Sequence, residues 1–351
     1  MNVSRECISN AWKGRVSGCQ LGKAVERLSM SEGPDALHAY LGSMQALPLR
    51  DYVPDDGSPI LFRRSCRGQL QRAEPDDDLN YSVLALMLLE RHGADLATVD
   101  VARAWLRWLP FAAVFTAEKA AYLTLAMRAH DFFAYGADAG FDLADCADNA
   151  YNDWIGAQIR ADVYGWVCPG DPALAARLAA RDAALSHRGA GVHGAVFVAA
   201  CGAAIPAADS LGDAVRRACA EIPEDSPARW AIDLGRAVAG RDDALALLRA
   251  EYAALSPVHT LNNLALVVWA LLSYPDDFDA AIGEVVAAGW DTDCNGATVG
   301  GLWGITGRDI PARWTDPWQG RVAVSLAGQD EHALEDLVDR TVAVAMTLAA
   351  G

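Results

Sequence analysis

The chain is poor in lysine, in closely spaced cysteines and in alternating strand patterns. Only three of its 351 residues are lysines (Lys13, Lys23 and Lys119), so arginine supplies nearly all of its positive charge. The formal net charge is −17, which disfavours a phosphate backbone or an anionic membrane surface as the main partner. We therefore expect no nucleic-acid backbone binding and no membrane binding.

The eight cysteines lie far apart, with no C-x-x-C pair and no framework of short spacings. This pattern indicates reduced, mostly buried thiols in a cytosolic protein. The N-terminal segment lacks the apolar stretch and the small-residue cleavage site of a signal peptide. We also predict no membrane-spanning helix, which needs about 18 apolar residues. The sequence thus predicts a soluble, cytoplasmic protein.

Helical patterns dominate what is present. Apolar runs are separated by short proline and glycine punctuation, and no long linker or internal repeat stands out. The predicted helices cover residues 79–92, 97–109, 117–134, 172–187, 191–204, 210–221, 227–238, 241–254, 260–273, 277–288, 294–305 and 330–349. The least regular stretch, 43–75, is predicted to be a long active-site loop. We therefore predict one all-α domain over residues 1–351.

Two acidic groups, Asp76-Asp77-Asp78 and Asp291-Thr292-Asp293, each precede an apolar helical run. A single aspartate at a helix start is an ordinary cap, favoured by the helix dipole. Five aspartates would repel one another strongly if the fold brought the two groups together. A hard divalent cation with oxygen ligands would neutralise them. The pattern therefore favours a metal site.

The second acidic group is open to other interpretations. The string DTDCNG matches the start of an EF-hand loop, but Leu302 stands where that loop needs a glutamate. It is also similar to the D-x-D-x-T motif of aspartyl-phosphate hydrolases, but Asn295 replaces the threonine and parallel strands are lacking. Gly296, Gly300 and Gly304 recur at every fourth position, which lets another helix approach closely. A metal site at a closely packed helix start is the interpretation that remains.

The sequence resembles the ADP-ribosylglycohydrolase family, which includes dinitrogenase-reductase-activating glycohydrolase, from about residue 10 to 310. Gly14, Gly18, Gly22 and Glu26 are similar to its glycine-rich N-terminal helix. Asp76-Asp77-Asp78 resembles its T-D-D segment, and Gly289 to Cys294 resembles its G-x-D-T-D-[ST] segment. The stretch from Gly156 to His187 is similar to its substrate loop and the following helix.

The resemblance implies an all-α, compact orthogonal bundle that carries two Mg²⁺ ions, with Mn²⁺ as a possible substitute. A metal pair can orient sugar hydroxyls and activate water for attack on the anomeric carbon. The implied metal ligands are Asp76, Asp77, Asp78, Asp291 and Asp293. The implied catalytic residues are Glu26, Asp77, Asp78 and Asp291. The implied substrate-binding residues are Gly156, Arg160, Asp162, His187 and Trp290.

The chain departs from the family pattern at three places. Asp76 and Cys294 replace hydroxyl ligands, and we expect Cys294 to pack without binding the hard cation. The loop from Trp154 to Arg160 differs from the family's G-N-G-x-x-M-R at two of its first three positions. We therefore predict a Mg²⁺-dependent hydrolase of the N- or O-glycosidic bond of ADP-ribose, or a related ribosyl group, on a protein side chain or small molecule. Two alternatives remain: hydrolysis of a nucleoside-like N-glycoside, and a non-catalytic ADP-ribose-binding or structural protein.

Overall fold

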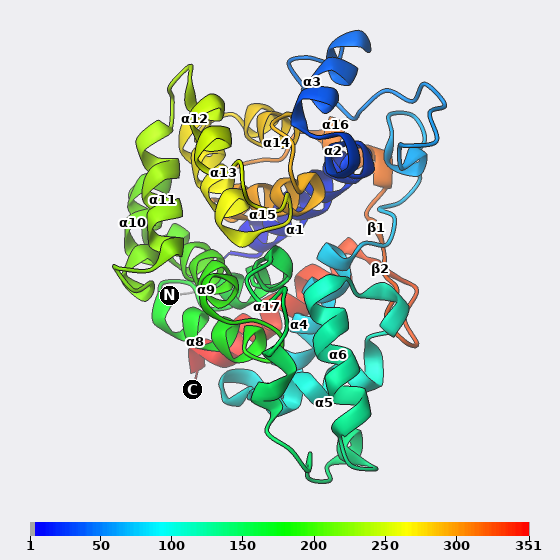
Figure 1. Cartoon of the computed structure of the whole chain (residues 1–351), viewed down its shortest axis with the longest axis vertical. Helices are drawn as coiled ribbons and strands as arrows, with labels where there is room; N and C mark the ends of the chain where they lie inside the picture. Colours follow the sequence, from blue (N-terminus) through cyan, green and yellow to red (C-terminus); the bar gives the residue numbers. More distant parts are fainter. Residues whose placement is uncertain (1–3, 351) are drawn as a thin grey trace.

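The structure, a computed structural model, describes residues 4–350 and confirms the predicted all-α class (Figure 1). The α-helices are α1 (Arg5–Lys23), α2 (Glu26–Glu32), α3 (Pro34–Ser43), α4 (Asp77–His92), α5 (Thr98–Trp108), α6 (Thr116–Arg128), α7 (Asp162–Trp166), α8 (Pro172–Ala183), α9 (Gly189–Ala204), α10 (Leu211–Ala218), α11 (Pro227–Val238), α12 (Ala244–Glu251), α13 (Thr260–Ser273), α14 (Phe278–Ala287), α15 (Thr292–Gly304), α16 (Ala312–Thr315) and α17 (Leu334–Ala350). The strands β1 (Arg321–Ala323) and β2 (Glu331–Ala333) pair antiparallel. Buried apolar side chains from Ile8 to Ala345 form one cluster that these helices enclose.

Short 3-10 helices connect several of the longer elements. They are η1 (Arg63–Ser65), η2 (Gly93–Asp95), η3 (Phe111–Ala113), η4 (Phe133–Tyr135), η5 (Leu143–Ala147), η6 (Ile155–Arg160), η7 (Ile205–Ala207), η8 (Cys219–Glu221) and η9 (Asp316–Trp318). The stretch 43–75 is irregular apart from η1, as predicted.

Each predicted helical segment contains an α-helix, but several boundaries are wrong; 172–187, for example, extends four residues beyond the end of α8 at Ala183. The segment 117–134 ends early, because α6 stops at Arg128 and Phe132 adopts a left-handed backbone (φ 63°) that an α-helix cannot contain. The segment 330–349 begins with β2, which pairs with β1 before α17 starts. Helix α1 (Arg5–Lys23) was expected only from the family resemblance, and α2, α3, α7 and α16 were not predicted. These four are short, and short helices depend on tertiary packing.

The prediction that no segment could span a membrane also needs correction. By length and composition, residues Gly189–Ala207 could cross a membrane. Within the fold, however, 72% of this window is buried, and α9 packs against α7 and α8. Burial among neighbouring helices is what a core helix shows.

Helices α1 and α15 lie antiparallel with their backbones in contact. A Cβ atom built on Gly18 would overlap the carbonyl oxygen of Gly296, and one built on Gly14 would overlap that of Gly300. The same holds for Gly22 against the carbonyl oxygen of Thr292. The close helix approach predicted from the glycine spacing is therefore confirmed, at a propensity cost of about 1 kcal/mol per glycine. Because the pair is antiparallel, the C-terminus of α1 meets the N-terminus of α15.

Helix α4 brings the first acidic group to the same place. Asp76 is its N-cap, with an extended backbone and a carboxylate oxygen that accepts a hydrogen bond from the Asp78 N–H at 3.0 Å. Gly93 ends the helix with a positive φ of 52°. All side chains from Asp78 to Leu89 are buried, so α4 is a central helix of the fold.

Candidate metal centre

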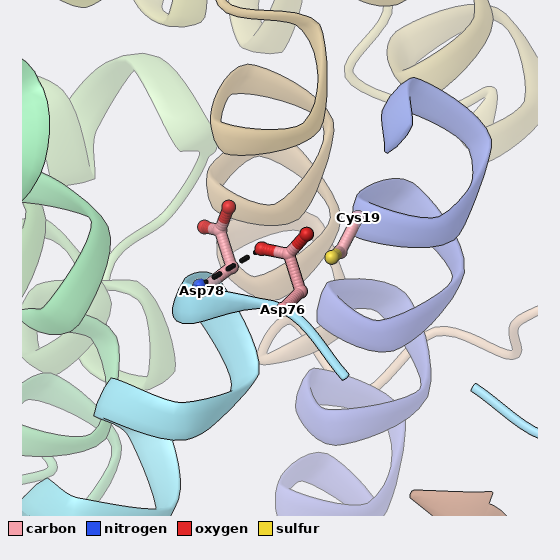
Figure 2. Close-up of side chains that lie close together, drawn as sticks. All are labelled: Cys19, Asp76 and Asp78. Carbon is pink, nitrogen blue, oxygen red and sulfur yellow. Dashed lines mark hydrogen bonds between the residues drawn. The ribbon is translucent and has the colours of Figure 1, made fainter. Parts of the chain in front are cut away.

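The two acidic groups meet at the adjoining ends of α1, α4 and α15. One ligand atom from each of Asp76, Asp77, Asp78 and Asp293 lies within 4.8 Å of the others, and the same holds for Glu26, Asp291 and Asp293. Asp293 belongs to both sets. Figure 2 shows Asp76 and Asp78 at the start of α4, facing Cys19 on α1. We call the six carboxyl-bearing residues the acidic cluster: Glu26, Asp76, Asp77, Asp78, Asp291 and Asp293.

Among the described residues, two fully buried oxygens of the acidic cluster have no hydrogen-bond partner. They are Oδ2 of Asp78 and Oδ1 of Asp293, on side chains only 0% and 2% exposed. Leaving a buried polar atom unpaired is costly, and most such atoms in folded proteins have a partner. A convergent set of carboxylate oxygens suits Mg²⁺, which prefers hard oxygen ligands. The residues present therefore fit the cation that the sequence implies.

Burial and mutual repulsion dominate the electrostatics of the cluster. Burial, together with the nearby Asp293 and Asp76, raises the pKa of Glu26 to about 9. Burial and Asp76 raise the pKa of Asp293 to about 6. The pKa values of Asp77 and Asp291 are raised well above their ordinary range, again by burial first and by neighbouring carboxyls second. The cluster resists full ionisation unless positive charge is supplied.

Two cationic side chains supply part of that charge. Arg15, fully buried on α1, donates to Oδ1 of Asp78 at 3.1 Å and to Oδ2 of Asp162 at 2.7 Å. Burial still raises the pKa of Asp78 well above its ordinary value, although Arg15 acts against this rise. Lys23 donates to Oδ2 of Asp76 at 2.6 Å. Burial alone would raise the pKa of Asp76, but Lys23 brings it below the ordinary value.

A second buried charge network lies beside the cluster, and its charged groups are paired with one another. Arg160 donates to Oε1 of Glu118 at 2.7 Å and to the carboxylate of Asp182. The hydroxyl of Tyr164 donates to the other Asp182 oxygen at 2.6 Å, and Ser186 accepts from Arg160 at 2.8 Å. These five residues form what we call the arginine network. Among the described residues, it contains no buried carboxylate oxygen without a partner.

Two cavities adjoin the acidic cluster, with volumes of about 510 Å³ and about 150 Å³. Glu26, Asp77 and Phe115 line both of them. The larger cavity also borders Lys23 and Phe62, so the irregular stretch 43–75 does reach the site. Its volume is within the range of small-molecule sites. The smaller cavity is also lined by Met30, Thr116, Ala117, Glu118, Trp154, Ile155, Gly156, Ile159, Val258, Asp291, Asp293 and Cys294.

The residues predicted to bind substrate are distributed unequally around this site. Gly156 lines the smaller cavity, and a Cβ built on it would overlap Glu118. Arg160 and Asp162 line neither cavity, because both side chains are enclosed in buried ion pairs. Trp290 is 9% exposed and also lines neither.

His187 borders a different hollow, which contains no member of the acidic cluster. Its ring lies 2.7 Å from Ser186 Oγ, and burial lowers its pKa well below the ordinary value. His187 is therefore neutral and packs behind the arginine network rather than in either cavity beside the cluster.

A strained turn places Asp291 and Asp293. Trp290 has a left-handed backbone with φ 60°, which is uncommon for a large residue. Its carbonyl oxygen accepts a hydrogen bond from Ser29 at 2.7 Å, and the Asp291 N–H donates to Oδ1 of Asn263 at 3.3 Å. Trp290 thus helps to turn the chain from α14 into α15, and local strain of this kind is common at functional sites.

Several residues of the site were missed in the sequence, and three of them carry charge close to the acidic carboxyls. Arg15 and the mostly buried Lys23 are the cations paired with the acidic cluster, and Glu118 is a cavity-lining carboxyl. The sequence held a signal for Lys23, because lysine is rare in this chain and Lys23 directly follows Gly22 of the glycine-rich motif. No local pattern marks Glu118, whose partner Arg160 lies 42 residues away.

Comparison with known proteins agrees with this geometry. A family model described as ADP-ribosylglycohydrolase matches residues 3–348. A solved structure titled "ADP-ribosylglycohydrolase-related protein complex" is similar over 97% of this chain and 99% of the other, with a TM-score of 0.54 at 17% identity. At that identity the likeness concerns the fold. A search of curated sequences gives no significant match.

Proposed function

The chain belongs to the ADP-ribosylglycohydrolase family, and from this premise we propose that it is a Mg²⁺-dependent glycosidase. The proposed reaction removes ADP-ribose, or a related ribosyl group, from a protein side chain or a small molecule. One observation carries the proposal: the carboxylates of Asp78 and Asp293 lie close together, each has one buried oxygen without a partner among the described residues, and Asp293 lines the smaller cavity. The acidic cluster would hold the metal, and Mn²⁺ is expected to replace Mg²⁺.

A bound divalent cation would supply charge that orients sugar hydroxyls and makes a water more acidic. The protein's own groups would do the rest. Glu26 and Asp77 face both cavities, so either can exchange a proton with a molecule there. In hydrolysis one carboxylate takes a proton from the water, the water oxygen bonds to the anomeric carbon, the glycosidic bond breaks, and the leaving atom takes a proton from a protonated carboxyl. The pKa of Glu26 is raised to about 9 without a cation, and a nearby cation would lower it toward the range in which a carboxyl can both give and take a proton.

Substrate choice is proposed to depend on the wall formed by Trp154, Gly156 and Glu118 in the smaller cavity. Arg160 and Asp162 are proposed to position other residues rather than to touch the substrate. Arg160 donates a hydrogen bond to Glu118, and Asp162 accepts one from Arg15. Cytoplasmic location remains part of the proposal, and it is supported by the eight free cysteines, seven of them buried.

A substrate panel tests the proposal. Purified protein with Mg²⁺ is given ADP-ribosyl-arginine, ADP-ribosyl-serine and simple nucleosides, and free ADP-ribose or ribose is measured. We expect ADP-ribose release that EDTA stops. Cleavage of nucleosides alone would favour the nucleoside-like substrate, and calorimetry without Mg²⁺ binding would favour a non-catalytic protein.

A further inference from the structure

Lys23 is placed as an internal counter-ion of the acidic cluster. It is the last residue of α1, and its side chain is 12% exposed. Its ammonium lies 2.6 Å from Oδ2 of Asp76 and 4.6 Å from the centre of the Phe62 ring. The ring face favours a cation, so Phe62 and Asp76 together fix the ammonium at the border of the larger cavity.

The protein already uses both carboxylate oxygens of Asp76. Oδ2 accepts from Lys23, and Oδ1 accepts from the N–H of Asp78 at 3.0 Å. Asp78 and Asp293 differ, because each keeps one buried oxygen without a hydrogen-bond partner. Within the acidic cluster, an external cation would therefore find unpaired carboxylate oxygens on Asp78 and Asp293 rather than on Asp76.

The cluster contains two overlapping carboxylate sets that meet at Asp293. One set includes Asp76, which Lys23 neutralises directly. The other consists of Glu26, Asp291 and Asp293, and the ion pairs of the described residues include none for these three. A divalent ion added to the first set would lie close to a buried ammonium, and like charges in a buried site repel strongly.

We propose that the Lys23 ammonium takes the place of one of the two divalent ions. The chain then binds a single ion, held by the set without ion pairs among the described residues, Glu26, Asp291 and Asp293. Lys23 is thus a positioning and charge-compensating residue, not a catalytic one. The inference rests on the metal site of the proposed function and changes the occupancy expected of that site from two ions to one.

Counting bound Mn²⁺ tests this. The full chain is titrated with Mn²⁺, and the ions bound per chain are measured by calorimetry and by the electron paramagnetic resonance of the bound metal. A single ion gives an isolated Mn²⁺ spectrum, whereas two ions sharing Asp293 give a spin-coupled one. We expect one ion and an isolated spectrum for the unmodified chain.

Lys23→Met removes the charge and keeps the aliphatic stem; Lys23→Gln is a second neutral variant in case the first folds poorly. We expect both to bind two ions with a coupled spectrum. Lys23→Arg keeps the charge and should bind one. Lys119→Met is the matched control, because Lys119 also lies over a ring, that of Phe111 at 5.4 Å, but has no ion pair among the described residues. It should bind one ion.

The possible results separate cleanly. Two ions in the unmodified chain, or one ion in both neutral variants, would overturn the inference and leave the proposed function standing. A coupled pair in Lys23→Arg would also overturn it, because charge would not be the cause. No bound Mn²⁺ in any variant would overturn the metal site of the proposed function and this inference with it.

Discussion

The acidic cluster and the arginine network are both buried and both charged, but they differ in how far their charges are paired. In the arginine network, Arg160 lies between Glu118 and Asp182, and Tyr164 satisfies the remaining Asp182 oxygen. In the acidic cluster, six carboxyls face two cations, and oxygens of Asp78 and Asp293 stay unpaired. The arginine network pairs its charges within the chain, whereas the acidic cluster keeps two buried oxygens without a partner among the described residues.

This difference separates a structural from a functional use of buried charge. A paired network fixes the positions of its members, so it can hold the wall of a cavity in place. An incomplete cluster costs stability in the metal-free protein and gains it back when a cation binds to the folded state. Removing a charged side chain should therefore act mainly on metal binding and activity in the acidic cluster, and mainly on stability in the arginine network.

The largest expected effect is on activity. Asp293→Ala removes the carboxylate that both ligand sets share, so Mg²⁺ binding should be lost and hydrolysis should fall by about 10³-fold or more, which corresponds to about 4 kcal/mol of lost transition-state stabilisation. Calorimetry and ADP-ribose release measure the two losses. Asp35→Ala is the control, because the Asp35 side chain is 98% exposed. Retained turnover in Asp293→Ala would contradict the assigned site.

The same kind of change in the arginine network should act on stability. Arg160→Met leaves Glu118 and Asp182 buried without their cation, which should lower the free energy of unfolding by about 3–5 kcal/mol. Chemical denaturation measures this. Arg321→Met, which breaks an ion pair with Glu331 near the surface, should cost less than about 1 kcal/mol. Equal effects of the two changes would mean that the network is not the structural element we describe.

Separating α1 from α15 should damage the cluster more than the network. Gly18→Ala places a methyl group against the carbonyl of Gly296, and we expect a loss of about 1–3 kcal/mol in stability together with weaker Mg²⁺ binding. Gly42→Ala is the matched control, since a Cβ there meets only Leu47 at 3.9 Å. It should be neutral or slightly stabilising. Thermal unfolding and calorimetry compare the two, and unchanged Mg²⁺ affinity in Gly18→Ala would show that the cluster tolerates helix separation.

The smallest expected effect is a pH dependence of the metal-free protein. The pKa of Asp293 is about 6 in the folded state, above the ordinary value of 3.8. Between these values the folded state binds more protons than the unfolded chain, so the free energy of unfolding falls as pH rises. With EDTA, the melting temperature should drop by a few °C between about pH 4 and about pH 7.

Saturating Mg²⁺ should reduce that slope, because the cation favours the ionised carboxyls. Asp293→Asn should remove the part of the slope that Asp293 contributes. A melting temperature in EDTA that rises over the same range would contradict the sign.

The helices could be predicted because they depend on local patterns, whereas the meeting of the acidic groups was expected from their charge and from the family resemblance. A long apolar run behind an aspartate-rich start marks α4, and the glycine spacing of α15 indicates a close helix partner. The identity of that partner was not readable, and neither were the pairs Arg15–Asp162 and Arg160–Glu118. These contacts join residues 147 and 42 positions apart, so they are products of tertiary folding. The substrate-binding roles of Arg160 and Asp162 were predicted without these ionic partners in view. A buried ion pair holds each side chain away from the two cavities.

The glycine contact between α1 and α15 also bears on how such a protein can change over evolutionary time. Where helices pack through side chains, each core substitution shifts their separation a little. Here backbone touches backbone at Gly14, Gly18 and Gly22, so that separation is independent of the side chains around it. The surrounding core and the cavity walls can drift while Lys23 and Asp293 stay at a fixed spacing. A new substrate specificity could then arise without rebuilding the proposed metal centre.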